Sequence, residues 1–404
     1  MNDIRRPIKA ALLQVHSLAG LALALLWAVV GITGATMVFE DEIEASLNSH
    51  IMRVDAGATR RLTPDELVAR LQSAGDFGRA SAVTMASDPS AAARIRFARS
   101  EGGARPSSVY VDPYNGHVLG SPRGGDFFAT IRKLHRWLLL PGDGNGIGRK
   151  ITGSAAIGLI VMLITGLVLR WPHRARSVKM WLKPNLGLRG RGLHRSLHAV
   201  IGTWVLPVYL VMTLTGLWYS FEWYKAGANW LLARPQATDA AMQPKPPRGA
   251  AVSGGKGDAK TDTSAEAKPL AFDRVWTTFL QQENNDYGRV LLTLPAGAGT
   301  AVRVRSWPRD SWLESVRDEF RIDAVTGRVI SSDRYADKTL GERVLAGVLD
   351  IHRGAILGWP GKLAFMLAAA MMPLFAVTGL LLYLSRRRHR RLVRQPVGHL
   401  VPGE

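Results

Sequence analysis

The chain has 404 residues, of which 47% are hydrophobic, and it contains no cysteine. The lack of cysteine excludes disulfides, thiolate-bound iron–sulfur clusters and the covalent attachment of c-type haem. The formal net charge of +20 would suit a nucleic-acid-binding protein. Four long apolar runs instead indicate an integral membrane protein, and much of the basic charge lies beside those runs.

The first apolar run follows a short basic N-terminus that contains Arg5, Arg6 and Lys9. The run is too long for a signal-peptide core, and no small-x-small cleavage site follows it. We therefore predict a retained signal anchor, with a cytoplasmic N-terminus and the first transmembrane helix in residues 1–40.

Three further apolar runs cover Ile151–Trp171, Ala199–Phe221 and Leu363–Leu384. Lys and Arg gather in the loop 173–197 and in the tail 386–404. The positive-inside rule then predicts a multi-pass protein of the bacterial inner membrane with both termini and this loop in the cytoplasm. Binding of nucleic acid or anionic lipid is an alternative role for the loop, but orientation explains its charge better, and we expect membrane lipid and no nucleic acid among the partners.

The two long connections, 41–133 and 223–348, then lie on the periplasmic side. Each contains a strand-turn-strand pattern, SSVYVDPYNGHVLG in the first and FRIDAVTGRVISSD in the second, with an Asp and a Gly at matching positions. We expect a small α+β domain in each connection. Residues 233–270 are poor in aromatic residues and rich in Pro, Gly, Ala and charge, which predicts a disordered insertion.

The first and third apolar runs share one sequence skeleton. Each begins with a His and has a Gly four residues later, then a Thr-Gly pair and a Phe-Glu pair, at identical spacing in His16–Glu40 and His198–Glu222. At 3.6 residues per turn, His16, Gly20 and Gly34 point the same way along a helix. The third run repeats this arrangement with His198, Gly202 and Gly216.

A histidine beside a gap on an apolar helix suggests a flat ligand bound by the imidazole, and haem iron accepts an axial His. The alternative is that the glycines permit close helix packing and that the His lies near the headgroups. For one helix that alternative is the better explanation. The occurrence of two copies favours haem.

The repeat continues into the second helix of each half, in segments 134–172 and 349–385. His135 precedes a Pro-Gly pair and a span with Thr165-Gly166 near its end, and His352 precedes the same features with Thr378-Gly379. Proline between the His and the span should break the helix and leave each His on a short interfacial segment. Either His alone would be an ordinary interfacial residue, but the pair suggests ligands.

Together these patterns predict two His near each membrane face. A haem held by His16 and His198 would pack against Gly166 and Gly379, and one held by His135 and His352 would lie near Gly34 and Gly216. His194, four residues before His198, is an alternative ligand at the inner site. His173 is also expected on the cytoplasmic side, but it lies in the basic loop. Four other histidines have no repeat partner and receive no role: His50, His117, His389 and His399.

These motifs resemble the PepSY-associated transmembrane proteins, in particular the inner-membrane ferric-siderophore reductases among them. The resemblance implies a membrane all-α four-helix bundle built from two repeated halves, with two small periplasmic α+β (PepSY-like) domains. It also implies two haems b bound by the four His above, and an enzyme that passes electrons across the membrane to reduce a ferric siderophore in the periplasm and release iron. No flavodoxin or nucleotide-binding segment is present, so the donor should be a separate cytoplasmic molecule or a quinol, and we assign no catalytic side chain.

Two other functions suit parts of the sequence. A haem-free PepSY membrane protein could regulate a peptidase or sense an envelope ligand, and the His pairs would then be structural. A haem or iron permease would need an ion path, which four helices without buried carboxylates supply poorly.

Overall fold

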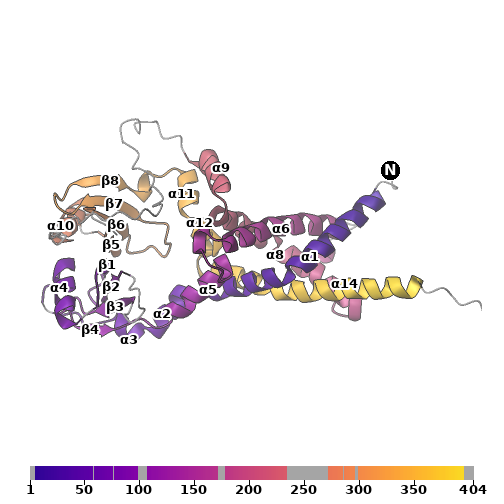
Figure 1. Cartoon of the computed structure of the whole chain (residues 1–404), viewed down its shortest axis with the longest axis horizontal. Coiled ribbons are helices and arrows are strands. Elements are labelled where there is room, and N and C mark those ends of the chain that lie inside the picture. Colours follow the sequence, from indigo (N-terminus) through magenta and orange to yellow (C-terminus); the bar gives the residue numbers. More distant parts are fainter. Residues whose placement is uncertain are drawn as a thin grey trace, which may run out of the picture. The chain divides into compact units, whose positions relative to one another are not determined.

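The computed structural model in Figure 1 describes residues 5–57, 59–75, 77–98, 107–171, 178–233, 272–284, 286–295 and 299–394. Nearly all of the predicted insertion 233–270, together with His173 and His399, lies outside the described residues. The chain forms two compact units. The helical unit contains Met1–Leu47, Arg123–Gly227 and Ala346–Glu404, and the sheet unit contains Asn48–Pro122 and Ala228–Leu345.

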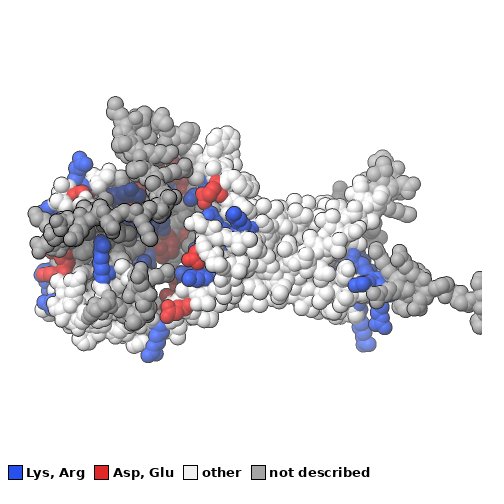
Figure 2. Space-filling model, in the orientation of Figure 1, with Lys and Arg blue, Asp and Glu red and all other residues white. Residues whose placement is uncertain are grey.

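Within the described residues, four helical segments are long and apolar enough to cross a membrane: Pro7–Met37, Ile147–Arg170, Gly190–Ser220 and Ala355–His389. They belong to α1 (Arg5–Met37), α6 (Ile147–Arg170), α8 (Gly190–Ser220), and the consecutive helices α13 (Gly358–Ala370) and α14 (Met372–Arg394). Many of their apolar side chains point outward, such as Leu25 and Val377. On the face seen in Figure 2, their surface is nearly free of charge between its two ends. These features are those of a multi-pass membrane protein.

The four spans pack as a bundle. Helices α1 and α8 each contact α6 and α14, so α1 and α8 face each other diagonally. The buried residues of the bundle core lie mostly near the middle of the spans. They are Trp27, Ala155, Val205, Tyr209, Ala368 and Met372.

Two spans differ from the expected helices. The fourth is broken at Met371, just before Pro373, because proline has no N–H to donate to the carbonyl four residues earlier. The third begins at Gly190 rather than at His198, so His194 and His198 lie on one continuous helix.

Shorter helices join the spans. They are α2 (Glu40–Leu47), α5 (Gly125–Trp137), η1 (Asp143–Asn145), α7 (Val178–Leu182), α9 (Glu222–Leu232), α12 (Val348–His352) and η4 (Ala355–Leu357). The break that was expected at proline occurs near Pro141, after Leu138 and Leu139 in the left-handed region. In the second half, the expected break at proline does not occur. Pro360 lies in the first turn of α13, and the chain bends before it, at Gly354 and Gly358 with φ of 72° and 66°.

The sheet unit contains one antiparallel sheet in the order β4-β3-β2-β1-β5-β6-β7-β8. The strands are β1 (Ala80–Ala86), β2 (Ala93–Phe97), β3 (Ser108–Val111), β4 (Val118–Gly120), β5 (Arg289–Thr293), β6 (Ala301–Trp307), β7 (Asp318–Asp323) and β8 (Val329–Asp333). The two connections, each of which was expected to hold a small α+β domain, thus contribute four strands each to one continuous sheet. Strands β1 and β5 pair from Ala82 with Thr293 to Ala86 with Arg289, because each presents an otherwise unpaired edge.

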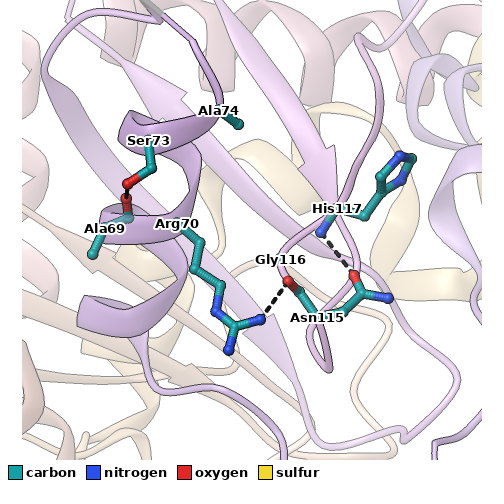
Figure 3. A pocket seen from close by; sticks show the side chains of 7 residues that line it. All are labelled: Ala69, Arg70, Ser73, Ala74, Asn115, Gly116 and His117. Atoms are coloured by element: carbon teal, nitrogen blue, oxygen red, sulfur yellow. Dashed lines mark hydrogen bonds between the residues drawn. The ribbon is translucent and has the colours of Figure 1, made fainter.

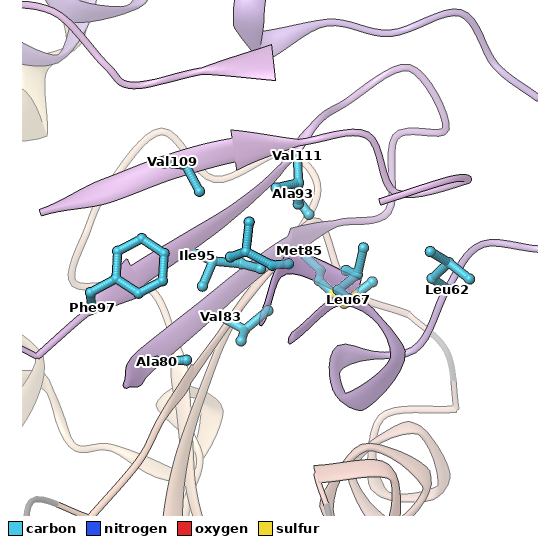
Figure 4. Close-up of a cluster of buried hydrophobic side chains, with 11 residues drawn as sticks. Leu62, Leu67, Ala80, Val83, Met85, Ala93, Ile95, Phe97, Val109 and Val111 are labelled. Atoms are coloured by element: carbon cyan, nitrogen blue, oxygen red, sulfur yellow. The ribbon is translucent and has the colours of Figure 1, made fainter. Parts of the chain in front are cut away.

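Short helices accompany this sheet: α3 (Ser49–Met52), α4 (Pro64–Ala74), α10 (Phe272–Gln282), η3 (Tyr335–Asp337) and α11 (Leu340–Ala346). Leu67 and Leu71 of α4 pack on the first four strands (Figure 4), and Val275 and Phe279 of α10 pack on the last four. Trp276 contacts both clusters. One hydrophobic layer thus continues across the β1–β5 seam.

Both predicted turns are present. Gly116, at φ 77°, donates its N–H to the Asp112 carbonyl at 2.9 Å, and Gly327, at φ 73°, donates to the Asp323 carbonyl at 2.8 Å. The left-handed conformation explains the glycine at each position. Thr300 and backbone N–H groups hold the pKa of Asp323 at about 2.

Candidate functional site

The helical unit brings His16 of α1 and His198 of α8 together across the bundle diagonal. Their ring centres are 6.4 Å apart and their planes are inclined by 77°. Two imidazoles that share one metal ion, with bonds of about 2 Å each, have ring centres about 6 Å apart. The spacing of this inner pair therefore suits a shared ion. His198, rather than His194, is the residue that faces His16.

The other predicted pair also meets. His135, in the last turn of α5, and His352, at the end of α12, have ring centres 6.5 Å apart and planes inclined by 71°. Burial is the main cause that lowers the pKa of His135 to about 4 and that of His352 to about 3. Both rings of this outer pair are therefore neutral at pH 7, and neutral imidazole is the metal-binding form.

Each of the four imidazoles has its Nδ1 beside a threonine hydroxyl, and each threonine comes from a Thr-Gly pair. The Nδ1–Oγ1 distances are 2.9 Å for His16 and Thr165, 2.8 Å for His198 and Thr378, 3.1 Å for His135 and Thr33, and 2.8 Å for His352 and Thr215. The sequence pointed to the glycines of these pairs, but the role of the threonines was missed. Their recurrence beside each glycine was the available signal.

The four threonine hydroxyls already donate their hydrogens to carbonyl groups of their own helices. Each hydroxyl donates to the carbonyl four residues earlier, at 2.7 Å in Thr33, 2.8 Å in Thr165, 2.6 Å in Thr215 and 2.7 Å in Thr378. Its oxygen can then only accept, so the imidazole Nδ1 carries the hydrogen. The Val30 carbonyl, 3.0 Å from Nδ1 of His135, requires the same tautomer. Nε2 is left as the bare nitrogen in all four rings.

The glycine after each threonine lets the imidazole edge approach the helix. A Cβ built on Gly34 would lie 3.1 Å from Cε1 of His135, and one on Gly166 would lie 3.2 Å from Cε1 of His16. The corresponding distances are 3.7 Å for Gly216 and His352 and 3.8 Å for Gly379 and His198. These glycines, which we expected to pack against a haem, therefore lie against the imidazole rings themselves.

Gly20 and Gly202 border the inner pair but leave no empty slot. A Cβ on Gly20 would lie 2.9 Å from the terminal methyl of Met162, and one on Gly202 would lie 3.6 Å from the edge of Phe375. The ring of Phe375 also meets that of His198, with centres 5.3 Å apart. A flat ligand that rested on Gly20 would have to displace the flexible end of Met162.

The two pairs lie near opposite ends of the bundle. His16 and Thr33, which touch the inner and outer pairs respectively, are seventeen residues apart on α1, and this corresponds to about 25 Å along a helix. His198 and Thr215 have the same spacing on α8. Since a hydrocarbon core is about 30 Å thick, one pair would lie toward each face.

Nothing in the described ranges gathers three or more His, Cys, Asp or Glu side chains in a way that could hold a metal ion. Each histidine pair offers two imidazoles, and haem iron takes two axial imidazoles. The donor set and the ring spacing both fit this group.

Charged side chains surround the outer pair. Glu40, only 5% exposed, forms an ion pair with Arg132, and its other oxygen lies 3.8 Å from Arg353. Arg136 lies over the ring of Tyr219, 5.8 Å from its centre, and burial lowers the pKa of its guanidinium.

The sheet unit has a shallow pocket of about 700 Å³ (Figure 3). Arg70 donates to the Asn115 carbonyl there at 2.8 Å. The lining contains none of the predicted site residues, and it consists of Ala69, Arg70, Ser73, Ala74, Asn115, Gly116 and His117.

Comparison with known proteins gives one family. The family described as PepSY-associated TM region matches residues 13–386. This range includes both histidine pairs, all six predicted glycines and the whole sheet. No curated protein matches the sequence.

Proposed function

We propose that this chain, which belongs to the PepSY-associated transmembrane family, is a two-haem oxidoreductase of the bacterial inner membrane. In this proposal it carries electrons from the cytoplasmic side to a ferric siderophore in the periplasm, and reduction releases the iron. The observation that carries the proposal recurs at all four histidines. A threonine oxygen accepts from the imidazole Nδ1–H, and the glycine after it lets the ring edge approach the helix. The ring, whose Nε2 carries no hydrogen, lies beside a second imidazole.

A haem-free regulator explains this arrangement less well. Packing alone does not require two pairs of imidazoles with ring centres 6.4 and 6.5 Å apart. Nor does it require the same tautomer four times, enforced by a threonine that is already bonded to its own helix. Imidazoles whose other ring nitrogen is held by a hydrogen bond are typical of metal ligation.

In this proposal the four histidines bind the haems and the four threonines orient the histidine rings. His16 and His198 hold the inner haem, and His135 and His352 hold the outer haem, while Thr165, Thr378, Thr33 and Thr215 orient the rings. A bound haem supplies one-electron transfer between its ferric and ferrous states. The apolar bundle excludes water and charged carriers between the two pairs.

The substrate follows from the family resemblance and from coordination chemistry. Siderophores bind iron through hard oxygen ligands, which prefer the ferric ion, so reduction weakens binding and frees the metal. The expected donor is a separate cytoplasmic molecule or a quinol. Positive charge at the N-terminus, in the loop 173–197 and in the tail supports a topology with both termini in the cytoplasm.

The first experiment is an absorption spectrum of the purified protein in detergent, with the haem extracted and quantified. We expect two non-covalent haems b per chain and a sharp low-spin spectrum. A colourless protein from haem-replete cells would contradict the proposal and favour the regulator.

The second experiment tests direction in sealed vesicles. With a donor confined to the cytoplasmic side, His16→Ala and His135→Ala should both stop reduction of a ferric siderophore on the other side. With an impermeant reductant on the periplasmic side, His16→Ala should still turn over and His135→Ala should not. Equal loss in both variants under periplasmic reductant would refute the series order, and wild-type haem that ferric siderophore does not reoxidise would refute the reductase assignment.

A further inference from the structure

Two aromatic residues lie between the histidine pairs at matching positions in the two halves. Trp27 and Tyr209 each come eleven residues after the inner histidine of the same helix. Both are buried in the bundle core. The repeat therefore places a large aromatic side chain at the same depth on both diagonal helices.

Each of these side chains is fixed by a hydrogen bond to a neighbouring helix. Trp27 Nε1 donates to the Ala155 carbonyl at 3.0 Å, and the Tyr209 hydroxyl donates to the Ala368 carbonyl at 2.7 Å. The two acceptors also match, since each lies ten residues before the threonine of the inner site on its span. Aromatic rings held in this way have one orientation in the core.

The pair occupies the interval that an electron must cross. Along α1, Trp27 is about 16 Å from His16 and about 9 Å from Thr33, which touches the outer pair. In the second half Phe375 extends the series of rings toward the inner site. Its centre is 5.3 Å from that of His198 and 6.0 Å from that of Tyr209.

We propose that Trp27, Tyr209 and Phe375 form the bridge that couples the two haems electronically, an inference that rests on the proposed function. One electron leaves the ferrous inner haem, which becomes ferric, and reaches the ferric outer haem, which becomes ferrous. The bridge residues are neither oxidised nor reduced. They provide polarisable, close-packed atoms across the middle of the bundle, where a packing gap would weaken the coupling.

A packing role alone would be served by the aliphatic side chains that fill the rest of this core. The decisive comparison therefore removes the rings and the hydrogen bonds separately. Trp27→Phe and Tyr209→Phe keep an aromatic ring without its donor. Trp27→Leu and Tyr209→Leu remove the ring as well. Trp204→Leu is the matched control, because Trp204 lies on α8 but is 48% exposed.

The measurement uses fully reduced protein in oriented vesicles with an impermeant oxidant on the outer-haem side. Stopped-flow spectra then give a fast phase for the outer haem and a second phase for electron transfer from the inner haem. We expect the second phase to slow several-fold in both Leu variants, and to stay near the wild-type rate in the Phe variants and in Trp204→Leu. Haem content and midpoint potentials are measured for every variant.

Wild-type transfer rates in Leu variants that retain both haems and their potentials would overturn the bridge. Phe variants as slow as the Leu variants would also overturn it, because the hydrogen bond would then be the important feature. Loss of haem from the Leu variants, with wild-type rates in the Phe variants, would assign the rings a structural role instead. A wild-type protein without haem would refute the proposed function itself, so the two failures are distinct.

Discussion

The inner and outer histidine pairs have nearly the same geometry but different supports. Their ring centres are 6.4 and 6.5 Å apart, and every ring has a Thr-Gly pair at its edge. The inner rings project from the long spans α1 and α8. The outer rings project from α5 and α12, which have 13 and 5 residues.

This difference shows that the Thr-Gly contact, rather than the element that carries the histidine, is what the two sites share. Helix packing alone fixes the backbone positions of the inner rings. The outer rings depend in addition on the turns after α5 and α12, which contain residues of positive φ. We therefore expect the inner pair to be the more rigid and the outer pair to adjust more readily.

The largest expected effect is the loss of one haem when a single histidine is replaced, and it distinguishes the inner site from the outer site. His16→Ala or His198→Ala should remove one haem per chain, and His135→Ala or His352→Ala should remove the other, because a site with two axial ligands loses most of its affinity with either one. Extracted haem per protein should fall by half. His194→Ala is the control and should retain both haems. Full haem content in all four ligand variants would contradict both assignments.

A smaller effect should distinguish the glycines within each site. Ala at Gly166 or Gly34 places a Cβ 3.2 or 3.1 Å from an imidazole carbon, whereas Ala at Gly379 or Gly216 leaves 3.8 or 3.7 Å. Overpacking costs about 1–3 kcal/mol, which corresponds to roughly a 5- to 150-fold loss of haem affinity at the first two positions.

Gly379→Ala and Gly216→Ala are the matched controls for these variants, because they add the same methyl group to a helix. Haem-transfer titration to a competing haem-binding protein would measure the affinities. Since the outer rings can adjust, the loss should be larger for Gly166→Ala than for Gly34→Ala. A larger loss of haem affinity in Gly34→Ala than in Gly166→Ala would indicate that the outer pair is the more rigid one.

Removing one threonine hydroxyl should have a modest effect on potential. Thr165→Val deletes the acceptor for His16 Nδ1–H, which makes the imidazole a weaker donor to ferric iron. A hydrogen bond of about 1 kcal/mol corresponds to roughly 40 mV for one electron. Redox titration should therefore show one haem shifted upward by this amount, with Thr165→Ser close to wild type.

The same substitution at Thr33 should shift the other haem less, since the Val30 carbonyl still accepts from His135 Nδ1 at 3.0 Å. Unchanged potentials in Thr165→Val, with both haems bound, would contradict the role assigned to the threonines. A shift of both haems together would show that the two sites are not independent.

The smallest effect is expected from deletion of residues 237–266, which lie outside the described residues. This sequence lacks apolar periodicity and should contribute no core, and the cost of loop closure varies slowly with length. Haem content and thermal unfolding of the deletion variant should match wild type at both sites. Selective loss of either haem would show that the segment supports that site.

Local sequence patterns predicted the parts of the structure that depend on local chemistry. Helical spacing and the repeat pointed to both histidine pairs, which the structure brings together, and Asp and Gly positions predicted the two turns. The break at Met371 follows from Pro373, yet Pro207 leaves α8 unbroken. A proline therefore did not by itself determine where a span bends.

Nonlocal features were not predictable in this way. The pairing of β1 with β5 depends on two strand edges that are distant in the chain, so neither connection alone indicated a joint sheet. The hydrogen bonds of Thr33 and Thr165 require knowledge of which helices are neighbours. The matching depth of Trp27 and Tyr209 was visible in the repeat, but their contacts depend on the packed bundle.

Strand β1 and its neighbour β5 are made at very different times. Ala82 and Thr293 pair in the sheet, but two membrane-spanning segments lie between them in the chain. At about 5–20 residues per second, a ribosome needs roughly ten to forty seconds to make the intervening sequence. The edge of β1 has no partner strand during that interval, and such edges invite misassociation. The sheet can therefore be completed only after the second and third candidate spans and the strands that follow them have been made.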